Sequence, residues 1–132
     1  MACEPMGPIP GGELAGEIHV VPDDWAAVHE VDTVQVETRP DAPYSINIWA
    51  VGLGKNFYIA SGAGGESKWV EHLAMNSNVR LRIGKSIYEL RAVRVDDQTE
   101  LGQVRVRYIE KYGLGQDESM AAEAWIYRLD PR

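Results

Sequence analysis

Short segments in which apolar and polar residues alternate are the feature that most constrains the fold of this chain. The clearest is the run VRLRI at residues 79–83, and the turn Gly84-Lys85 joins it to a longer run at residues 87–95. Because successive side chains of a strand point to opposite faces of a sheet, each run predicts a half-buried strand. Such a short link favours antiparallel pairing, so the two runs predict a β-hairpin.

The same alternation predicts four more strands, and a very short one is expected at residues 18–21. The four cover residues 33–38, 44–51, 57–61 and 123–129. The turn at residues 53–56 is short enough to join two of them as a second hairpin. Six strands with inward-facing aliphatic side chains can curl into a small antiparallel barrel, which leaves few unpaired edges.

Helices are expected between these strands. A short one at residues 25–28 follows Asp23, whose carboxylate could cap it, and another begins at Lys68. A third covers residues 101–112, where apolar side chains recur every three or four positions, and Gly113 suits its left-handed cap. The predicted class is therefore mainly β, with two or three short helices covering the openings of the barrel.

Composition limits the partners and the location. The net charge is -7, from 20 acidic and 13 basic residues, so nucleic acid would be repelled. No apolar run approaches the roughly 20 residues that span a bilayer, and the N-terminus lacks the order of a signal peptide. Cys3 is the only cysteine, which excludes an intrachain disulfide and favours a reducing compartment. We expect a cytoplasmic protein that binds neither nucleic acid nor membrane.

The N-terminal residues differ in composition from the rest of the chain. Residues 1–16 hold three of the seven prolines and several glycines, which weaken both helix and sheet bonding. We therefore expect a flexible tail at residues 1–16 and a single domain at residues 17–132.

A glycine-rich segment leads into the second helix. Residues 62–67 read GAGGES and precede Lys68. Glycines permit positive φ angles and a close approach to main-chain amides, and the start of a helix attracts anions. The segment therefore predicts a bend that could hold a phosphate.

At this point the sequence resembles the pyridoxamine-phosphate-oxidase-like split barrels, which bind flavin mononucleotide (FMN) or a deazaflavin. The resemblance runs from about residue 31 to residue 129 and is strongest over residues 49–83, where WAV, FYIAS, the glycine-rich segment, SKW and NSNVRLRI follow one another. The endings YIEKYG and IYRLDP are more similar to a small uncharacterised branch, related to deazaflavin-dependent nitroreductases, than to the oxidase. The resemblance implies a split β-barrel that forms a homodimer.

The resemblance also implies which residues hold the cofactor, which in such families lies at the dimer interface. Its phosphate would contact Ser61, the glycines of the bend and Lys68. These glycines are Gly62, Gly64 and Gly65. For Lys68, an ordinary exposed lysine is the alternative interpretation.

Four other residues are candidates for the same site. Trp49 and Trp69 could stack on a flat ring, with packing in the core or at a dimer interface as the alternative. Asn47, on the same side as Trp49, could bond a ring carbonyl or nitrogen. Arg39 is the only cation of RPDAP at residues 39–43, where deazaflavin-dependent reductases usually carry a basic turn. This departure weakens the deazaflavin interpretation.

Other chemistries find little support in the residues. His19, His29 and His72 have no second histidine or cysteine at ligand spacing, so no metal site is predicted, and Ser61 and Ser67 are not in a nucleophile elbow. The leading hypothesis is an oxidoreductase that uses FMN, or alternatively a deazaflavin, to transfer hydride to or from a small molecule; no catalytic residue is assigned. The alternative is a non-catalytic split-barrel dimer without cofactor that binds another hydrophobic ligand or a protein.

Overall fold

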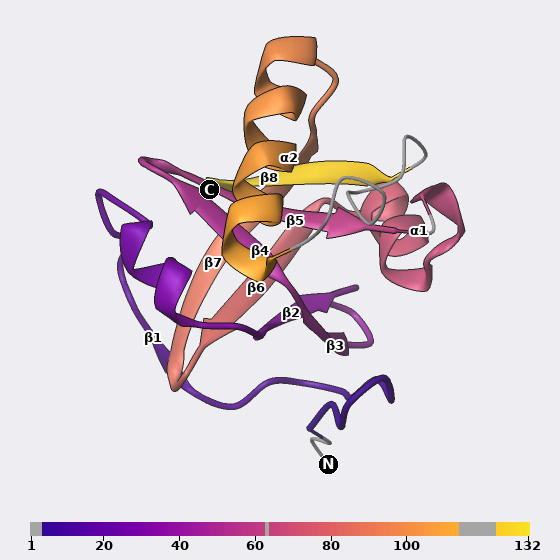
Figure 1. The fold of residues 1–132 in the computed structure, drawn as a ribbon. Helices are drawn as coiled ribbons and strands as arrows, with labels where there is room; N and C mark the ends of the chain where they lie inside the picture. Colours follow the sequence, from indigo (N-terminus) through magenta and orange to yellow (C-terminus); the bar gives the residue numbers. More distant parts are fainter. Residues whose placement is uncertain (1–3, 63, 114–123) are drawn as a thin grey trace.

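The computed structural model describes residues 4–62, 64–113 and 124–132, so Cys3, Ala63 and the start of the last predicted strand lie outside the described residues (Figure 1). Within these residues, eight strands and four helical segments follow one another. They are β1 (Glu17–Ile18), η1 (Ala26–Glu30), β2 (Val34–Thr38), β3 (Tyr44–Ile48), β4 (Ala50–Leu53), β5 (Asn56–Ser61), η2 (Gly64–Glu66), α1 (Lys68–Met75), β6 (Asn78–Ile83), β7 (Ser86–Arg94), α2 (Gln98–Tyr112) and β8 (Trp125–Pro131).

The strands form one sheet that closes on itself as a split barrel. Their order is β3-β2-β6-β7-β8-β5-β4, and β1 adds a short parallel pair to β7. The two ends of this order, β3 and β4, are consecutive in the chain and only Trp49 separates them. Because this one residue joins the opposite edges of the sheet, the sheet has to curl, and the bend at Trp49 marks the split.

The prediction of a mainly antiparallel split barrel is confirmed, but the described part of the chain forms eight strands rather than six. The predicted strand at residues 44–51 divides at Trp49, because β3 pairs with β2 while β4 pairs with β5. The very short strand expected at residues 18–21 is present as β1, which holds only Glu17 and Ile18. Both predicted hairpins are present, with Gly54 and Gly84 at positive φ in their turns.

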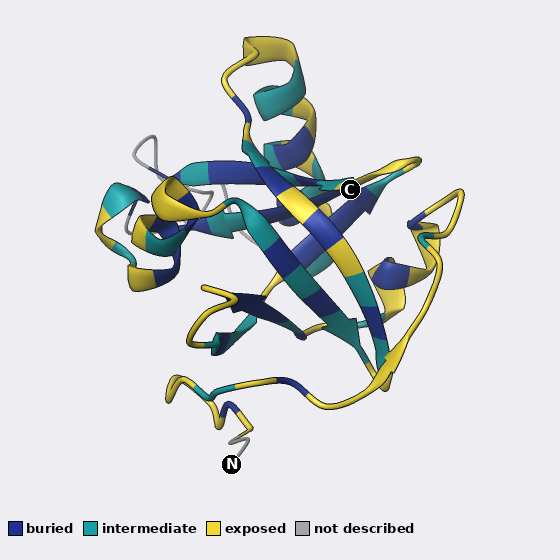
Figure 2. Cartoon of the chain, turned by 180° about the vertical axis from the view of Figure 1, so that it is seen from behind, coloured by how far each residue is buried: buried dark blue, intermediate teal, exposed yellow. Residues whose placement is uncertain are grey.

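Alternate side chains along the strands point to opposite faces of the sheet, and the buried ones form two separate cores, one on each face. Figure 2 shows the buried residues along the strands in dark blue. The larger core fills the barrel and includes Val36, Phe57, Ile59 and Leu81. The smaller core lies between the outer face of β4, β5 and β8 and the helix α2. It contains Val51, Tyr58, Val95, Val104, Tyr108 and Ile126. Residues of β4 and β5 thus serve both cores, which fixes α2 against the outside of the barrel.

The helices begin and end at polar or flexible residues. Asp97 caps α2 by accepting a hydrogen bond from the amide of Glu100, and Gly113 ends it with φ 65°. The short segment η1 is a 3₁₀ helix, and Trp25 rather than the predicted Asp23 stands at its N-cap. The carboxylate of Asp24 accepts a hydrogen bond from the amide of Ala26. Among the residues that the structure describes, no helix is long and apolar enough to cross a membrane.

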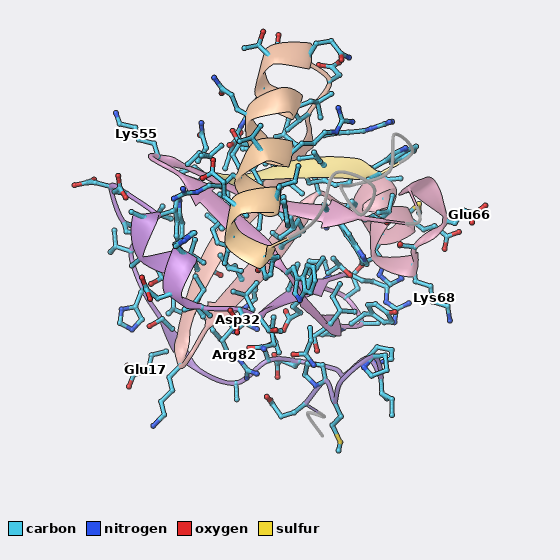
Figure 3. The ribbon with its side chains drawn as sticks, viewed as in Figure 1. Glu17, Asp32, Lys55, Glu66, Lys68 and Arg82 are labelled. Atoms are coloured by element: carbon cyan, nitrogen blue, oxygen red, sulfur yellow. The ribbon has the colours of Figure 1, made fainter. Side chains whose placement is uncertain are left out.

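Residues 4–16, expected to form part of a flexible tail, lie along the outside of β2, β3 and β6. Leu14 is 2% exposed, and its amide donates to the buried carboxylate of Glu37 at 2.7 Å. Gly11 and Ser45 exchange two main-chain hydrogen bonds at the free edge of β3. Arg82 extends toward this segment and pairs with Glu4 at 2.6 Å (Figure 3). The apolar side chain of Leu14 and these polar contacts hold a segment that its composition alone describes as loose.

Candidate functional site

The bend at Trp49 is held by the C-terminal turn of α2. The main-chain groups of Ala50 bond to α2 instead of to a strand. Its amide donates to the hydroxyl of Tyr112 at 3.0 Å, and its carbonyl accepts from the ammonium of Lys111 at 2.6 Å. Lys111 also donates to the carbonyl of Val28. Burial lowers the pKa of Lys111, because its ammonium is drawn into the protein to satisfy these carbonyls.

Both tryptophans predicted to bind a ring pack against other aromatic side chains. The indole of Trp49 stacks on the ring of Tyr112, with centroids 4.2 Å apart, and remains 48% exposed. Trp69 is 6% exposed and packs edge-on against Tyr127 in the barrel core. Trp49 therefore offers a free aromatic surface, whereas the ring of Trp69 is covered.

The structure brings Asn47 into contact with the N-terminal segment. Its amide nitrogen lies 3.3 Å from the carbonyl of Pro5 and 3.2 Å from that of Gly7, to which it donates. Its side-chain oxygen accepts a hydrogen bond from Gln35. All the polar atoms of this side chain thus have partners within the chain, and Asn47 is not gathered with the glycine-rich bend.

The glycine-rich bend closes on itself. The buried hydroxyl of Ser61 donates to the carbonyl of Gly64 at 2.9 Å and lies 2.6 Å from the hydroxyl of Ser67. A Cβ atom at Gly65 would lie 2.8 Å from the ring of Trp125, so this glycine permits close packing. Gly62 is exposed and has open space around its Cα atom. Two of the predicted phosphate ligands in the glycine-rich bend therefore make contacts within the chain: Ser61 bonds to Gly64, and Gly65 packs against Trp125.

A cationic cluster formed by Arg39, Lys68 and His72 lies beside this bend. Lys68 and His72 are one turn apart on α1, and Arg39 follows the last residue of β2. Arg39 and Lys68 are exposed, and Lys68 extends outward from the beginning of α1 (Figure 3). The ring of His72 packs edge-on against the ring of Tyr44, with centroids 4.8 Å apart. The guanidinium of Arg39 lies 5.9 Å from the centroid of the Tyr44 ring.

Local contacts fix the positions of Arg39 and His72. Arg39 has φ 56°, in the left-handed region, and its Nε atom donates to the carbonyl of Ala42 at 2.7 Å. The Nδ1 atom of His72 lies 2.8 Å from the hydroxyl of Thr38, and its Nε2 atom lies 3.5 Å from a guanidinium nitrogen of Arg39. A non-glycine residue at positive φ is uncommon and costs backbone energy, which marks the turn at Arg39 as unusual.

The surroundings of His72 disfavour its charged form. Burial lowers its pKa from 6.5, the charges of Arg39 and Lys68 lower it further, and the carboxylate of Glu71 acts in the opposite direction. The hydroxyl of Thr38 lies 3.4 Å from the carbonyl of Tyr44, to which it donates. In the neutral form with its proton on Nδ1, His72 donates to Thr38 and leaves Nε2 as an acceptor facing Arg39.

The cluster fits the phosphate group of a flavin-type cofactor better than the bend does. Two exposed cations and a histidine that can gain charge favour an anion, and guanidinium and ammonium groups both bond phosphate oxygens. In the bend, by contrast, the hydroxyl of Ser61 already donates to a main-chain carbonyl. Arg39 and Lys68 would therefore hold the anionic group, and the glycine-rich bend at residues 62–67 would form one side of the site.

The structure adds residues to the site that the sequence did not single out. Thr38 and Tyr44 belong to it because they hold His72, which the sequence analysis set aside as lacking ligand spacing. Tyr112 belongs to it because it positions Trp49. Each of these contacts joins residues at least 28 positions apart in the sequence, so no local pattern indicates them. Within the described residues, no group of three or more histidine, cysteine, aspartate or glutamate side chains could hold a metal ion.

Comparisons with solved structures place the fold among the split barrels. A putative pyridoxamine 5′-phosphate oxidase from Listeria innocua is 16% identical, with a TM-score of 0.63 over 80% of this chain and 89% of the other. An F420 reductase is 17% identical, with a TM-score of 0.58 over 85% and 96%. A FAD-binding protein from Mesorhizobium loti is 12% identical, with a TM-score of 0.58 over 80% and 86%. At these identities the likeness concerns the fold.

Sequence comparisons give the family. A search among curated proteins gave no match. The family model described as "uncharacterized protein conserved in bacteria (DUF2255)" matches residues 24–126, which include the whole cationic cluster and most of the barrel. The expected resemblance to the pyridoxamine-phosphate-oxidase-like split barrels is confirmed. The chain belongs to the DUF2255 family and has the pyridoxamine-phosphate-oxidase-like split-barrel fold.

Proposed function

We propose that this protein binds a phosphorylated flavin or deazaflavin and acts as an oxidoreductase that transfers hydride to or from a small molecule. The observation that carries the proposal is the cationic cluster, in which Arg39, Lys68 and His72 meet at the edge of a split barrel. In a chain of net charge -7, a local group of cations favours an anionic ligand. Fold relatives that include an F420 reductase and a FAD-binding protein support the same ligand class.

Each residue has a distinct role in this proposal. Arg39 and Lys68 hold the phosphate, and Thr38 orients the ring of His72 beside them. The half-exposed indole of Trp49 provides a flat surface for a ring. The bound cofactor supplies the hydride chemistry, while the protein supplies position and electrostatics. The proposal includes a cytoplasmic homodimer in which the cofactor lies between subunits.

A binding titration tests the proposal. The purified protein is titrated with FMN and, separately, with a deazaflavin, and absorbance and flavin fluorescence are recorded. We expect saturable binding, with affinity lowered about fivefold by Arg39→Gln or by Lys68→Ala, because each exposed charge contributes about 1 kcal/mol. Lys55→Ala is the matched control, since Lys55 lies in the hairpin turn far from Lys68 (Figure 3). Absence of saturable binding of either compound contradicts the proposal.

A second function is favoured by the closed bend. Because the hydroxyls of Ser61 and Ser67 bond to each other, this segment resembles a packed loop more than an open phosphate site. The alternative is a non-catalytic split-barrel dimer that binds another hydrophobic ligand or a protein partner. Stopped-flow measurement of flavin reduction separates the two: turnover that Lys68→Ala lowers at subsaturating flavin supports the enzyme, whereas a folded dimer without flavin binding supports the alternative.

A further inference from the structure

A second hollow lies on a different side of α1 from the cationic cluster. It has a volume of about 440 Å³ and is bordered by α1 and by the ends of β7 and β8 that lie next to it (Figure 1). Its apolar walls include Val70 and Leu73 of α1 and Trp125 and Tyr127 of β8. Its volume is within the range of small-molecule sites, and most of its lining side chains are apolar.

The charged residues of this hollow are Arg94 and Glu71. The guanidinium of Arg94 stacks on the indole of Trp125, with its central carbon 3.5 Å from the ring centroid. Among the described residues, no ion pair within 4.0 Å involves Arg94, and Glu71 is not joined to it. Stacking on the indole restricts the long arginine side chain and leaves the edge of the guanidinium available for hydrogen bonds.

Gly65 is required for this arrangement. A Cβ atom at this position would lie 2.8 Å from one ring carbon of Trp125 and 3.2 Å from another. Only glycine lets the indole lie against the bend, and the indole in turn supports Arg94. The glycine that the sequence suggests for phosphate binding thus shapes the second hollow.

We infer that this hollow binds a small monocarboxylate with a flat apolar body, such as an aromatic acid. The stacked guanidinium would hold the carboxylate through paired hydrogen bonds, and the apolar walls would cover the ring. Glu71 also lines the hollow, and its negative charge disfavours a ligand with two negative charges. This charge pattern separates the hollow from the cationic cluster, where Lys68 and His72 occupy another face of α1.

The test uses 2-naphthoate, with 2-naphthamide as a neutral analogue and 2-naphthyl phosphate as a doubly charged one. Binding is followed by NMR through the indole N–H signal of Trp125, which is identified by its loss in Trp125→Phe. We expect 2-naphthoate to shift this signal and to bind about tenfold more tightly than either analogue, in line with a hydrogen-bonded charge. Equal affinity for the acid and the amide, or no shift at all, overturns the inference.

Two variants locate the site. Arg94→Gln should remove the preference for 2-naphthoate over the amide. Arg91→Gln is the control, because Arg91 is an exposed arginine on the same strand that does not line the hollow. Gly65→Ala should weaken binding of the acid severalfold without changing any charge, since it displaces the indole. If Arg94→Gln and Arg91→Gln behave alike, the carboxylate is not held by Arg94 and the inference fails.

Discussion

The hydroxyl of Tyr112 holds the point where the barrel splits, and Tyr112→Phe tests this role. In the structure the hydroxyl accepts a hydrogen bond from the amide of Ala50 at 3.0 Å and donates to the carbonyl of Asp32 at 2.7 Å. Phenylalanine keeps the ring that stacks on Trp49 and removes only these bonds. Ala50 is fully buried, so its amide would be left without a partner.

The expected loss of stability follows from this unpaired amide. A buried donor that loses its partner costs about 1–3 kcal/mol, whereas the exposed carbonyl of Asp32 can bond to water instead. With an unfolding entropy of about 2.1 cal/mol/K per residue, the 132-residue chain has about 0.28 kcal/mol/K in total. A loss of about 2 kcal/mol therefore lowers the melting temperature by about 7 °C.

Differential scanning calorimetry and urea unfolding measure this change. Tyr88→Phe is the control, because the ring of Tyr88 packs against Trp25 and no hydrogen bond of its hydroxyl occurs among the described residues. Its melting temperature should stay within about 2 °C of the unchanged protein. If Tyr112→Phe is no less stable than Tyr88→Phe, the hydroxyl does not hold the bend.

Three further predictions concern the N-terminal segment, a buried ion pair and the histidine. Leu14→Ala should destabilise the protein by about 2–4 kcal/mol in urea unfolding, as expected for a buried leucine; no loss would show that the segment is loose in solution. Arg80→Met should cost about 3 kcal/mol, because Glu37 is 5% exposed and would lose its cation; an unchanged midpoint would refute this. The pKa of His72 in the folded state is lowered from 6.5, so as pH falls from about 6.5 to the folded-state pKa the unfolded chain binds more protons than the folded chain. The stability of the protein should therefore decrease as pH falls through this range. His72→Gln should remove this part of the pH dependence, and identical pH profiles of both proteins would contradict it.

Periodicity predicted strands such as β6 and β7 because each has one covered and one more exposed face. The alternation at residues 79–83 and the short turns after β4 and before β7 are local, so the sequence alone indicates both hairpins. The division at Trp49 could not be predicted in this way. Apolar residues continue on both sides of it, and the break depends on which strand each half pairs with.

The site was only partly accessible to sequence reasoning. Lys68 and Arg39 could be singled out from their positions in a known family order, but His72 becomes relevant only through Thr38 and Arg39, which lie more than 30 residues away. Composition also misjudged residues 4–16, because the single apolar residue Leu14 and several main-chain hydrogen bonds decide their position. Long-range contacts of this kind leave no periodic pattern.

The central claim is that the cationic cluster recognises the phosphate of a flavin-type cofactor. The most direct measurement compares the dissociation constants of FMN and riboflavin, which differ only in that phosphate, by equilibrium dialysis. The account predicts that FMN binds at least about tenfold more tightly, and that the combined Arg39→Gln and Lys68→Ala substitutions remove most of the difference. Equal affinities for the two compounds in the unchanged protein would contradict it.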